Sequence, residues 1–177
     1  LAATVRTTNP DFWAICLRKW LVAMVISWIK PDIVNHTALI LCGPQGCGKT
    51  TWLKALIPDV LSNYIFTGKV NVRDKDSQIK LSECCLIMDE LENMRRDTDA
   101  LKELITKSCI YVRRAYAFVH ENYTRRASFA GSTNNYDLLP DMTGNRRFLC
   151  FVAENIDNNH DVNMEQVYAQ AIALWVG

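Results

Sequence analysis

The chain has 177 residues, of which 49% are hydrophobic and 22% are charged, and its formal net charge is +1. These values are typical of one soluble globular domain and exclude a disordered, fibrous or strongly basic chain. With no overall charge to attract nucleic acid, any such contact would need a local basic patch. The longest apolar run, Trp20–Ile29, is too short to span a bilayer and has no export-cleavage pattern, so we expect a cytoplasmic protein.

The seven cysteines and three histidines do not form a recognisable metal or disulfide pattern. Most of the cysteines lie inside apolar runs, no Cys-x-x-Cys pair occurs, and the histidines are scattered. Buried, reduced thiols are the better interpretation, and a structural zinc site has no support.

The first elements in chain order are a helix and a strand. Asn9-Pro10-Asp11 is a helix-capping sequence, and the apolar spacing that follows predicts a helix over Asn9–Lys30 that ends before Pro31. The apolar segment Ala38–Cys42 predicts a strand, and Thr50–Leu56 predicts a helix that Pro58 terminates. Between Ser62 and Ser82 the pattern is weak and supports only a short strand and a short helix.

A glycine-rich segment joins that strand to that helix and fits the pattern G-x-x-x-x-G-K-[ST]. Glycines allow successive amide groups to wrap a polyphosphate, Lys49 supplies a positive charge, and Thr50 supplies a hard oxygen for Mg²⁺. A glycine-rich turn that binds nothing is the alternative. Cys47 is either a reactive thiol or merely a small residue here. The predicted nucleotide-binding residues, called the phosphate clamp below, are Gly43, Pro44, Gln45, Gly46, Cys47, Gly48, Lys49, Thr50 and Thr51.

The next strong feature is the apolar run Cys84–Leu91, which contains the acidic pair Asp89 and Glu90. This pattern is typical of a central parallel strand whose carboxyl end meets a ligand. Asp89 is the candidate metal residue and Glu90 the candidate base that activates water. Acidic pairs after strands also cap helices, so the prediction depends on the phosphate clamp upstream.

A helix over Asp97–Lys107 is predicted next, followed by a hairpin over Cys109–Arg126 in which arginines and aromatic residues are mixed. Cations can contact phosphates and rings can stack on bases, so the hairpin is a candidate single-strand binding element. A hairpin whose charges only maintain solubility is the alternative. The candidate nucleic-acid residues are Arg113, Arg114, Tyr116, Arg125 and Arg126.

A strand over Ala127–Asn135 ends in small polar residues, of which Asn134 is the candidate sensor of the terminal phosphate. Further on, Arg146 and Arg147 lie in a polar loop directly before another strand. Either arginine could reach the nucleotide of a neighbouring subunit as a finger, and a surface ion pair is the alternative. The tail carries an amphipathic helix from Met164 to Trp175 that we expect to cover the core.

With these motifs in hand, the chain resembles the virulence-associated protein E family of phages and mobile elements and, through it, the superfamily 3 helicases. The residues that carry the resemblance are Gly43–Thr50, Asp89–Leu91, Arg113–Tyr116, Ser132–Asn134 and Thr143–Phe148.

The resemblance implies an α/β fold of the P-loop NTPase type, AAA+-like, with a central parallel sheet flanked by helices and a β-hairpin insertion. It further implies a homo-oligomeric, hexameric ring in a bacterial host cell that hydrolyses ATP with Mg²⁺ between subunits and moves single-stranded DNA. The corresponding hairpin is Ile110–Arg126. Any primase or other replication domain would lie outside this segment. We divide the chain into a helical lead-in (1–37), an ATPase core (38–154) and a C-terminal helix (155–177).

Two other functions are compatible with the motifs. A P-loop kinase would transfer phosphate to a small metabolite, and it would be active as a monomer without an arginine from a neighbour. A nucleotide-switched interaction module would hydrolyse slowly and ignore single strands. The order of the motifs favours an ATP-dependent DNA helicase motor over both.

Overall fold

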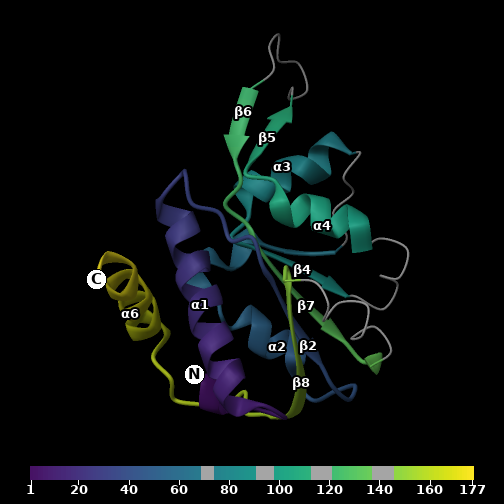
Figure 1. The fold of residues 1–177 in the computed structure, drawn as a ribbon, viewed down its shortest axis with the longest axis vertical. Helices are drawn as coiled ribbons and strands as arrows, with labels where there is room; N and C mark the ends of the chain where they lie inside the picture. The colour runs from purple at the N-terminus through teal and green to yellow at the C-terminus, as the bar shows by residue number, and fades with distance from the viewer. Residues whose placement is uncertain (69–73, 91–97, 113–120, 137–145) are drawn as a thin grey trace.

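The computed structural model describes residues 1–68, 74–90, 98–112, 121–136 and 146–177. Its main sheet has the strand order β1-β8-β2-β7-β4-β3, and a separate two-stranded sheet pairs β5 with β6 (Figure 1). The strands are β1 (Val5–Thr7), β2 (Ala38–Cys42), β3 (Ile65–Thr67), β4 (Leu86–Glu90), β5 (Cys109–Val112), β6 (Glu121–Thr124), β7 (Ser128–Thr133) and β8 (Phe148–Ile156).

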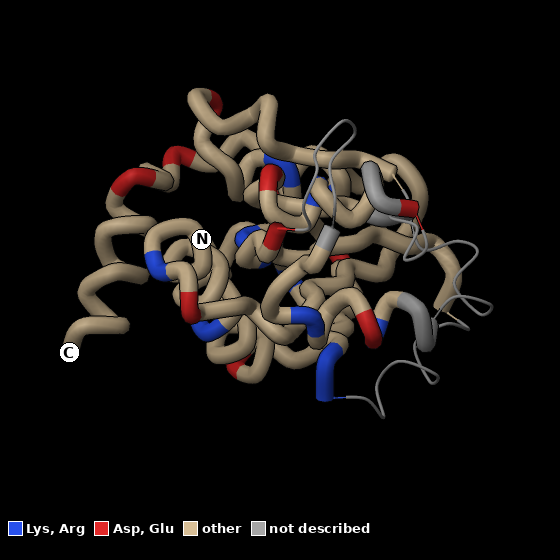
Figure 2. The backbone as a smooth tube through the Cα atoms, turned by 90° about the horizontal axis from the view of Figure 1, so that it is seen from above, with Lys and Arg blue, Asp and Glu red and all other residues tan. Residues whose placement is uncertain are grey.

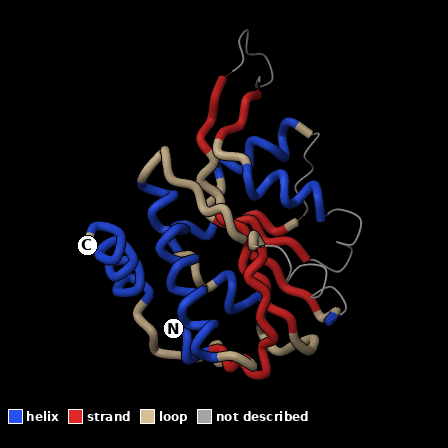
Figure 3. The backbone as a smooth tube through the Cα atoms, in the orientation of Figure 1, coloured by secondary structure: helices blue, strands red, loops and turns tan. Residues whose placement is uncertain are grey.

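Helices cover both faces of the main sheet, which gives a three-layer α/β architecture (Figure 3). The described helices are η1 (Ala2–Thr4), α1 (Pro10–Ile29), α2 (Lys49–Lys54), η2 (Asp59–Tyr64), α3 (Lys75–Glu83), α4 (Thr98–Thr106) and α6 (Met164–Val176), where η denotes a 3-10 helix.

The central strands are buried on both faces because their side chains alternate between two hydrophobic cores. In β2, Leu39 and Leu41 pack in a core with α1 and α2. Ala38 and Ile40 of the same strand pack in a second core with α3, α4 and the base of the β5–β6 hairpin. The continuous apolar run that predicted this strand therefore reflects burial from both sides.

Helix α1 begins at Asn9, whose side chain accepts a hydrogen bond of 3.2 Å from the Phe12 amide, as the capping sequence predicted. It is long and apolar enough to cross a membrane by length and composition, with a mean hydropathy of 1.6 over its 18-residue window. In the structure Trp13, Leu17 and Trp20 lie in the core beneath it. The helix packs between the sheet and α6, and this packing explains why it is apolar.

Strand β7 lies between β2 and β4, and all three are parallel. Parallel neighbours bring their carboxyl ends to one edge of the sheet, where ligands bind in open α/β sheets. The residues that follow β2, end β4 and follow β7 therefore meet at the same edge. These are the phosphate clamp, the acidic pair and Asn134.

The structure confirms the predicted fold class and adds one strand that sequence reasoning did not assign. Strand β1 pairs antiparallel with β8, with Val5 opposite Ile156, so the sheet is mixed at this edge. Strand β8 runs from Phe148 to Ile156, directly after Arg146 and Arg147, as predicted. The hairpin prediction is confirmed for its described strands β5 and β6, in which Ile110 pairs with Tyr123.

Candidate functional site

The phosphate clamp connects β2 to α2 through two glycines with left-handed backbone angles. Gly46 has φ +80° and Gly48 has φ +88°, a region that residues with a Cβ rarely adopt. A Cβ on Gly43 would lie 2.7 Å from the backbone oxygen of Ala153, so this position is closed by β8 rather than by its own φ. Each glycine of the motif is thus accounted for by backbone geometry or by close contact.

Lys49 is the best-connected side chain of the clamp. It is only 6% exposed, and its Nζ donates to the Gly43 oxygen at 2.8 Å and the Pro44 oxygen at 2.7 Å. Nζ also donates to Asn134 Oδ1 at 2.9 Å and lies 3.7 Å from Cys47 Sγ. An ammonium group so buried needs these acceptors to offset its lost hydration. The lysine is therefore already directed at the edge where β2 and β7 end.

A second contact joins the clamp to β7. Thr50 Oγ1 lies 3.2 Å from Ser132 Oγ, a residue that sequence reasoning did not assign to the site. These side chains border a polar cavity of about 480 Å³ at the carboxyl edge. The cavity is lined by Gln45, Gly46, Gly48, Lys49, Thr50, Thr51, Ser132, Thr133 and Asn134.

The acidic pair ends β4 beside this cavity. In the strand register Asp89 is opposite Gly131 and Glu90 is opposite Ser132 of β7. Their backbone positions thus place them at the end of the strand beside β7, which Asn134 follows. Their side chains lie outside what the structure describes.

Two of the residues at this edge carry oxygen donors of the kind that Mg²⁺ takes. Mg²⁺ keeps several waters and takes few protein ligands, with substrate phosphates completing its shell. Thr50 offers a hydroxyl, and Asp89 ends a neighbouring strand at the same edge. Among the described residues no group of three or more His, Cys, Asp or Glu side chains could hold a metal by itself.

Arg146 and Arg147 lie at the opposite edge of the sheet. The backbone oxygen of Arg147 accepts a 2.8 Å hydrogen bond from the Ala38 amide, and Phe148 pairs with Ala38 at the start of β2. The five residues of β2 separate this edge from the clamp by roughly 16 Å at the usual strand rise. Arg146 and Arg147 are therefore remote from the clamp of their own chain.

The hairpin residues Arg113, Arg114 and Tyr116 lie outside the described residues, so their predicted contact with nucleic acid stays a prediction. Arg125 corrects the prediction made for it: its side chain is 0% exposed and Nη2 donates to the Asn35 oxygen at 2.6 Å. The physical reason is that β6 ends at Thr124 and the chain turns inward to enter β7. A guanidinium group that is enclosed in this way cannot contact single-stranded nucleic acid.

Arg126 is exposed, but it too is attached to the body of the protein. Its Nη1 donates to the Trp28 oxygen near the end of α1 at 2.5 Å. Across the described chain, basic and acidic residues are interspersed, in line with the small net charge (Figure 2). The local basic patch expected at the hairpin thus loses Arg125 in this structure.

Asn158 lies near the clamp and was not among the residues predicted from the sequence. It lies in the loop after β8, and a Cβ built on Gly48 would be 2.0 Å from its Nδ2. An exposed asparagine in a polar loop has no distinctive sequence signal, because its importance comes from β8 and β2 ending at the same edge.

The cysteines are all free, but they are less uniformly buried than predicted. Cys16 and Cys42 are buried, whereas Cys109 is exposed on β5. Burial raises the pKa of Cys150 to about 12 and that of Cys85 to about 11, so both remain protonated at neutral pH. Burial also raises the pKa of Cys42 against the opposing effect of Lys49. These three thiols behave as apolar side chains.

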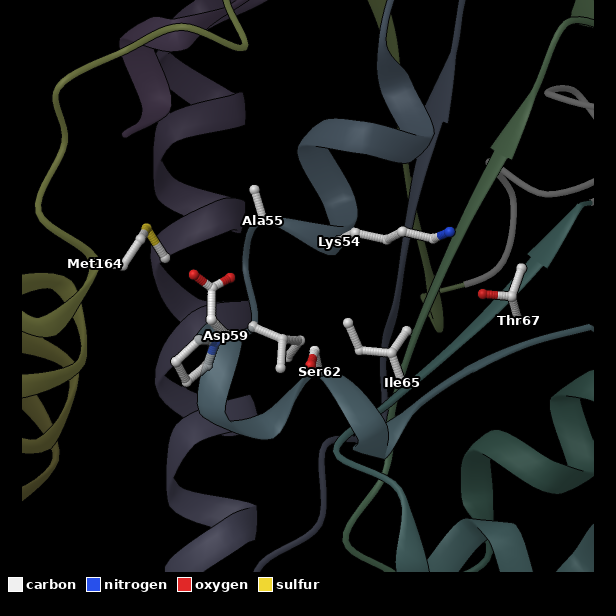
Figure 4. Close-up of a pocket in the computed structure, with 9 residues that line it drawn as sticks. Lys54, Ala55, Asp59, Ser62, Ile65, Thr67 and Met164 are labelled. Carbon is white, nitrogen blue, oxygen red and sulfur yellow. The ribbon is translucent and has the colours of Figure 1, made fainter.

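A second cavity, of about 540 Å³, lies behind the clamp helix (Figure 4). Lys54 from α2 extends across it toward Thr67 at the end of β3, and Asp59 and Met164 lie on its other side. None of the predicted site residues lines it. It is a groove beside the site rather than part of it.

Strand order, clamp conformation and the Lys49–Asn134 contact together define a mixed α/β protein whose central, mostly parallel sheet is flanked by helices and carries the glycine-rich clamp after β2. Comparison with protein families assigns it further. The model of the virulence-associated protein E-like domain matches residues 1–176, and the chain belongs to this family.

Among solved structures, the chain is similar to the C-terminal region of NrS-1. The A form apo structure of that region matches with a TM-score of 0.55 and 17% identity, over 86% of this chain and 38% of that one. A second apo structure, of residues 305–718, gives a TM-score of 0.53 and 16% identity, again over 86% of this chain and 38% of that one. At this identity the likeness shows the fold alone. The search of curated proteins found no match.

Proposed function

We propose that this domain is the ATP- and Mg²⁺-dependent motor of a phage or mobile-element replication protein, acting on single-stranded DNA as a ring. Membership of the virulence-associated protein E-like family supports a role in replication. The chain spans about 38% of the length of the similar solved chains, so the activity of the whole protein is part of the proposal.

The observation that carries the proposal is the contact between Lys49 Nζ and Asn134 Oδ1 at 2.9 Å. It joins the ends of β2 and β7, and the register of β4 brings Glu90 to the same edge. A phosphate-binding cation, a polar sensor and an acidic residue at one edge are what hydrolysis of a terminal phosphate needs.

Each residue has a separate role in this proposal. Lys49 would donate to the outer phosphates of ATP in place of some of its present acceptors, and clamp amides would bind the same phosphates. Thr50 and Asp89 would hold Mg²⁺, which neutralises charge on the phosphates when bound. Glu90 would orient and deprotonate the attacking water, while Asn134 would hydrogen-bond the water or the terminal phosphate.

An arginine finger would come from a neighbouring subunit. The position of Arg146 and Arg147 at the edge remote from their own clamp supports a role in trans, because the alternative of acting within one chain requires a span of roughly 16 Å. The clamp of one chain would then be half of an active site.

The test is the ATPase rate per chain, measured against protein concentration with and without a single-stranded oligonucleotide. The proposal predicts that the rate per chain rises with concentration as the ring assembles and that the oligonucleotide increases it further. Lys49→Ala should lack turnover under every condition. A rate per chain that is independent of concentration, in a monomer, would favour a kinase, and slow hydrolysis unaffected by oligonucleotide would favour an interaction switch.

A further inference from the structure

The two arginines Arg125 and Arg126 form the joint between the hairpin and strand β7. The Arg125 amide donates to the Ser108 oxygen at 3.1 Å, which closes the base of the hairpin. The Arg126 and Ala127 amides both donate to the Leu81 oxygen of α3, at 2.9 and 3.0 Å. Backbone hydrogen bonds therefore connect the joint both to Ser108, which precedes β5, and to Leu81 of α3.

Arg126 is linked to α1 through its side chain and through its backbone oxygen. Its Nη1 donates to the Trp28 oxygen at 2.5 Å. Its backbone oxygen lies 3.1 Å from Ser27 Oγ, whose single proton is shared with the nearer Met24 oxygen at 2.8 Å. Ser27 is 1% exposed whereas Arg126 is exposed, so this second contact is partly buried. The end of α1 is thus joined to the hairpin base by one exposed and one partly buried contact.

The Arg125 side chain makes buried contacts that connect the joint to the start of β7. Its Nη2 donates to the Asn35 oxygen at 2.6 Å, and its guanidinium lies 5.2 Å from the Phe129 ring centre. Asn35 in turn donates from Nδ2 to Ser128 Oγ at 3.2 Å. The guanidinium therefore contacts the segment after α1 and packs on β7.

Arg125 is held here at an electrostatic cost. Within the described part of the chain its Nε and Nη1 are buried and have no hydrogen-bond partner. Burial lowers its pKa to about 9, which still leaves it charged at neutral pH. An apolar side chain would fill such a space at less cost, so core packing alone does not explain an arginine at this position.

We propose that Arg125 and Arg126 are positioning residues, which fix the hairpin base to α1 and to β7 so that displacement of the hairpin is passed to Asn134. Strand β7 spans the six residues Ser128–Thr133 between the joint and Asn134. Figure 1 shows the hairpin projecting at the end of the molecule remote from the clamp. The inference rests on the proposed function, since it assigns the coupling between single-strand binding and hydrolysis.

Arg126 could act as a positioning residue or as a direct contact to a DNA phosphate. The two roles predict different salt dependences of DNA binding. Each phosphate contact to a single strand contributes about 0.7 to the slope of log affinity against log salt. Arg126→Met should leave the slope unchanged and lower the stimulation of ATPase by oligonucleotide roughly 2- to 10-fold, the range for losing one hydrogen bond. A slope reduced by about 0.7 would show that Arg126 is a phosphate contact and overturn the proposal.

Ser27→Ala provides a second test, because it removes the shared contact to the Arg126 oxygen without removing a charge. It should retain basal hydrolysis and lose oligonucleotide stimulation in the same direction as Arg126→Met. Lys19→Met, which removes an exposed cation elsewhere on α1, is the matched control and should change neither. Arg126→Lys, which keeps a donor for the Trp28 oxygen, should restore part of the stimulation. Unchanged stimulation in Ser27→Ala would overturn the proposal.

Hydrogen exchange separates this inference from the proposed function. In Ser27→Ala and Arg126→Met the paired amides of β5 and β6 should exchange roughly 2- to 10-fold faster than in the wild type and in Lys19→Met. If the wild-type protein ignores oligonucleotides, the proposed function fails, and exchange alone decides whether the joint anchors the hairpin. Exchange rates equal to wild type in both variants would show that it does not.

Discussion

Gly48→Ala tests whether the clamp depends on the backbone geometry seen in the structure. Gly48 has φ +88°, and the left-handed conformation costs a residue with a Cβ about 1–2 kcal/mol. The new Cβ would also meet Asn158 Nδ2 at 2.0 Å, and moving this exposed side chain off its rotamer adds about 0.5–1.5 kcal/mol. We therefore expect Gly48→Ala to lower the free energy of unfolding by about 1.5–3.5 kcal/mol.

Gly46→Ala is the matched control, because Gly46 has φ +80° but nothing within 4 Å of its Cβ position. It should cost only the backbone part, about 1–2 kcal/mol. The assay is urea unfolding of both variants and of Gly48→Ala combined with Asn158→Ala, which removes the clash. The double variant should recover about 0.5–1.5 kcal/mol relative to the sum of the single ones. Equal stabilities for Gly46→Ala and Gly48→Ala, with no such recovery, would refute the reasoning.

Two further predictions concern the core and the thiols. Trp13 is 1% exposed and packs 4.9 Å from the Phe151 ring, so Trp13→Ala should lower the free energy of unfolding by about 3–5 kcal/mol in urea titrations, far more than Phe12→Ala at a 54% exposed position. Similar losses for both variants would contradict this packing. Cys150 has its pKa raised from 9.0 to about 12 by burial, so the unfolded state loses this proton first and stability should fall as pH rises from 9 to 12. Thermal unfolding of Cys150→Ala should show a shallower fall than Cys109→Ala, and identical profiles would contradict the assignment.

Local patterns were sufficient to predict the elements that form the candidate site. Strand β2 has the predicted bounds Ala38–Cys42, because a fully apolar run of this length followed by glycines has few other structures available. The position of Lys49 followed from the clamp pattern in the same way. Fold class and the edge where the motifs meet were therefore accessible from the sequence.

Features that depend on tertiary contact were not accessible. Strand β1 is three residues long and exists because β8 pairs with it, so its sequence carries little signal of its own. Arg125 was assigned to nucleic acid from its charge, and only the inward turn between β6 and β7 shows that it is enclosed. Asn158 reaches the clamp from a loop more than 100 residues away in the chain.

The measurement that tests the central claim most directly compares ATP binding with ATP hydrolysis in Glu90→Gln. If Glu90 activates water at the phosphate clamp, the variant binds ATP as the wild type does while turnover falls by about 10²-fold or more. Glu165→Gln, an exposed carboxylate on α6, is the matched control and should hydrolyse ATP at the wild-type rate. Wild-type turnover in Glu90→Gln, or no hydrolysis by the wild-type protein under any assembly condition, would contradict the account.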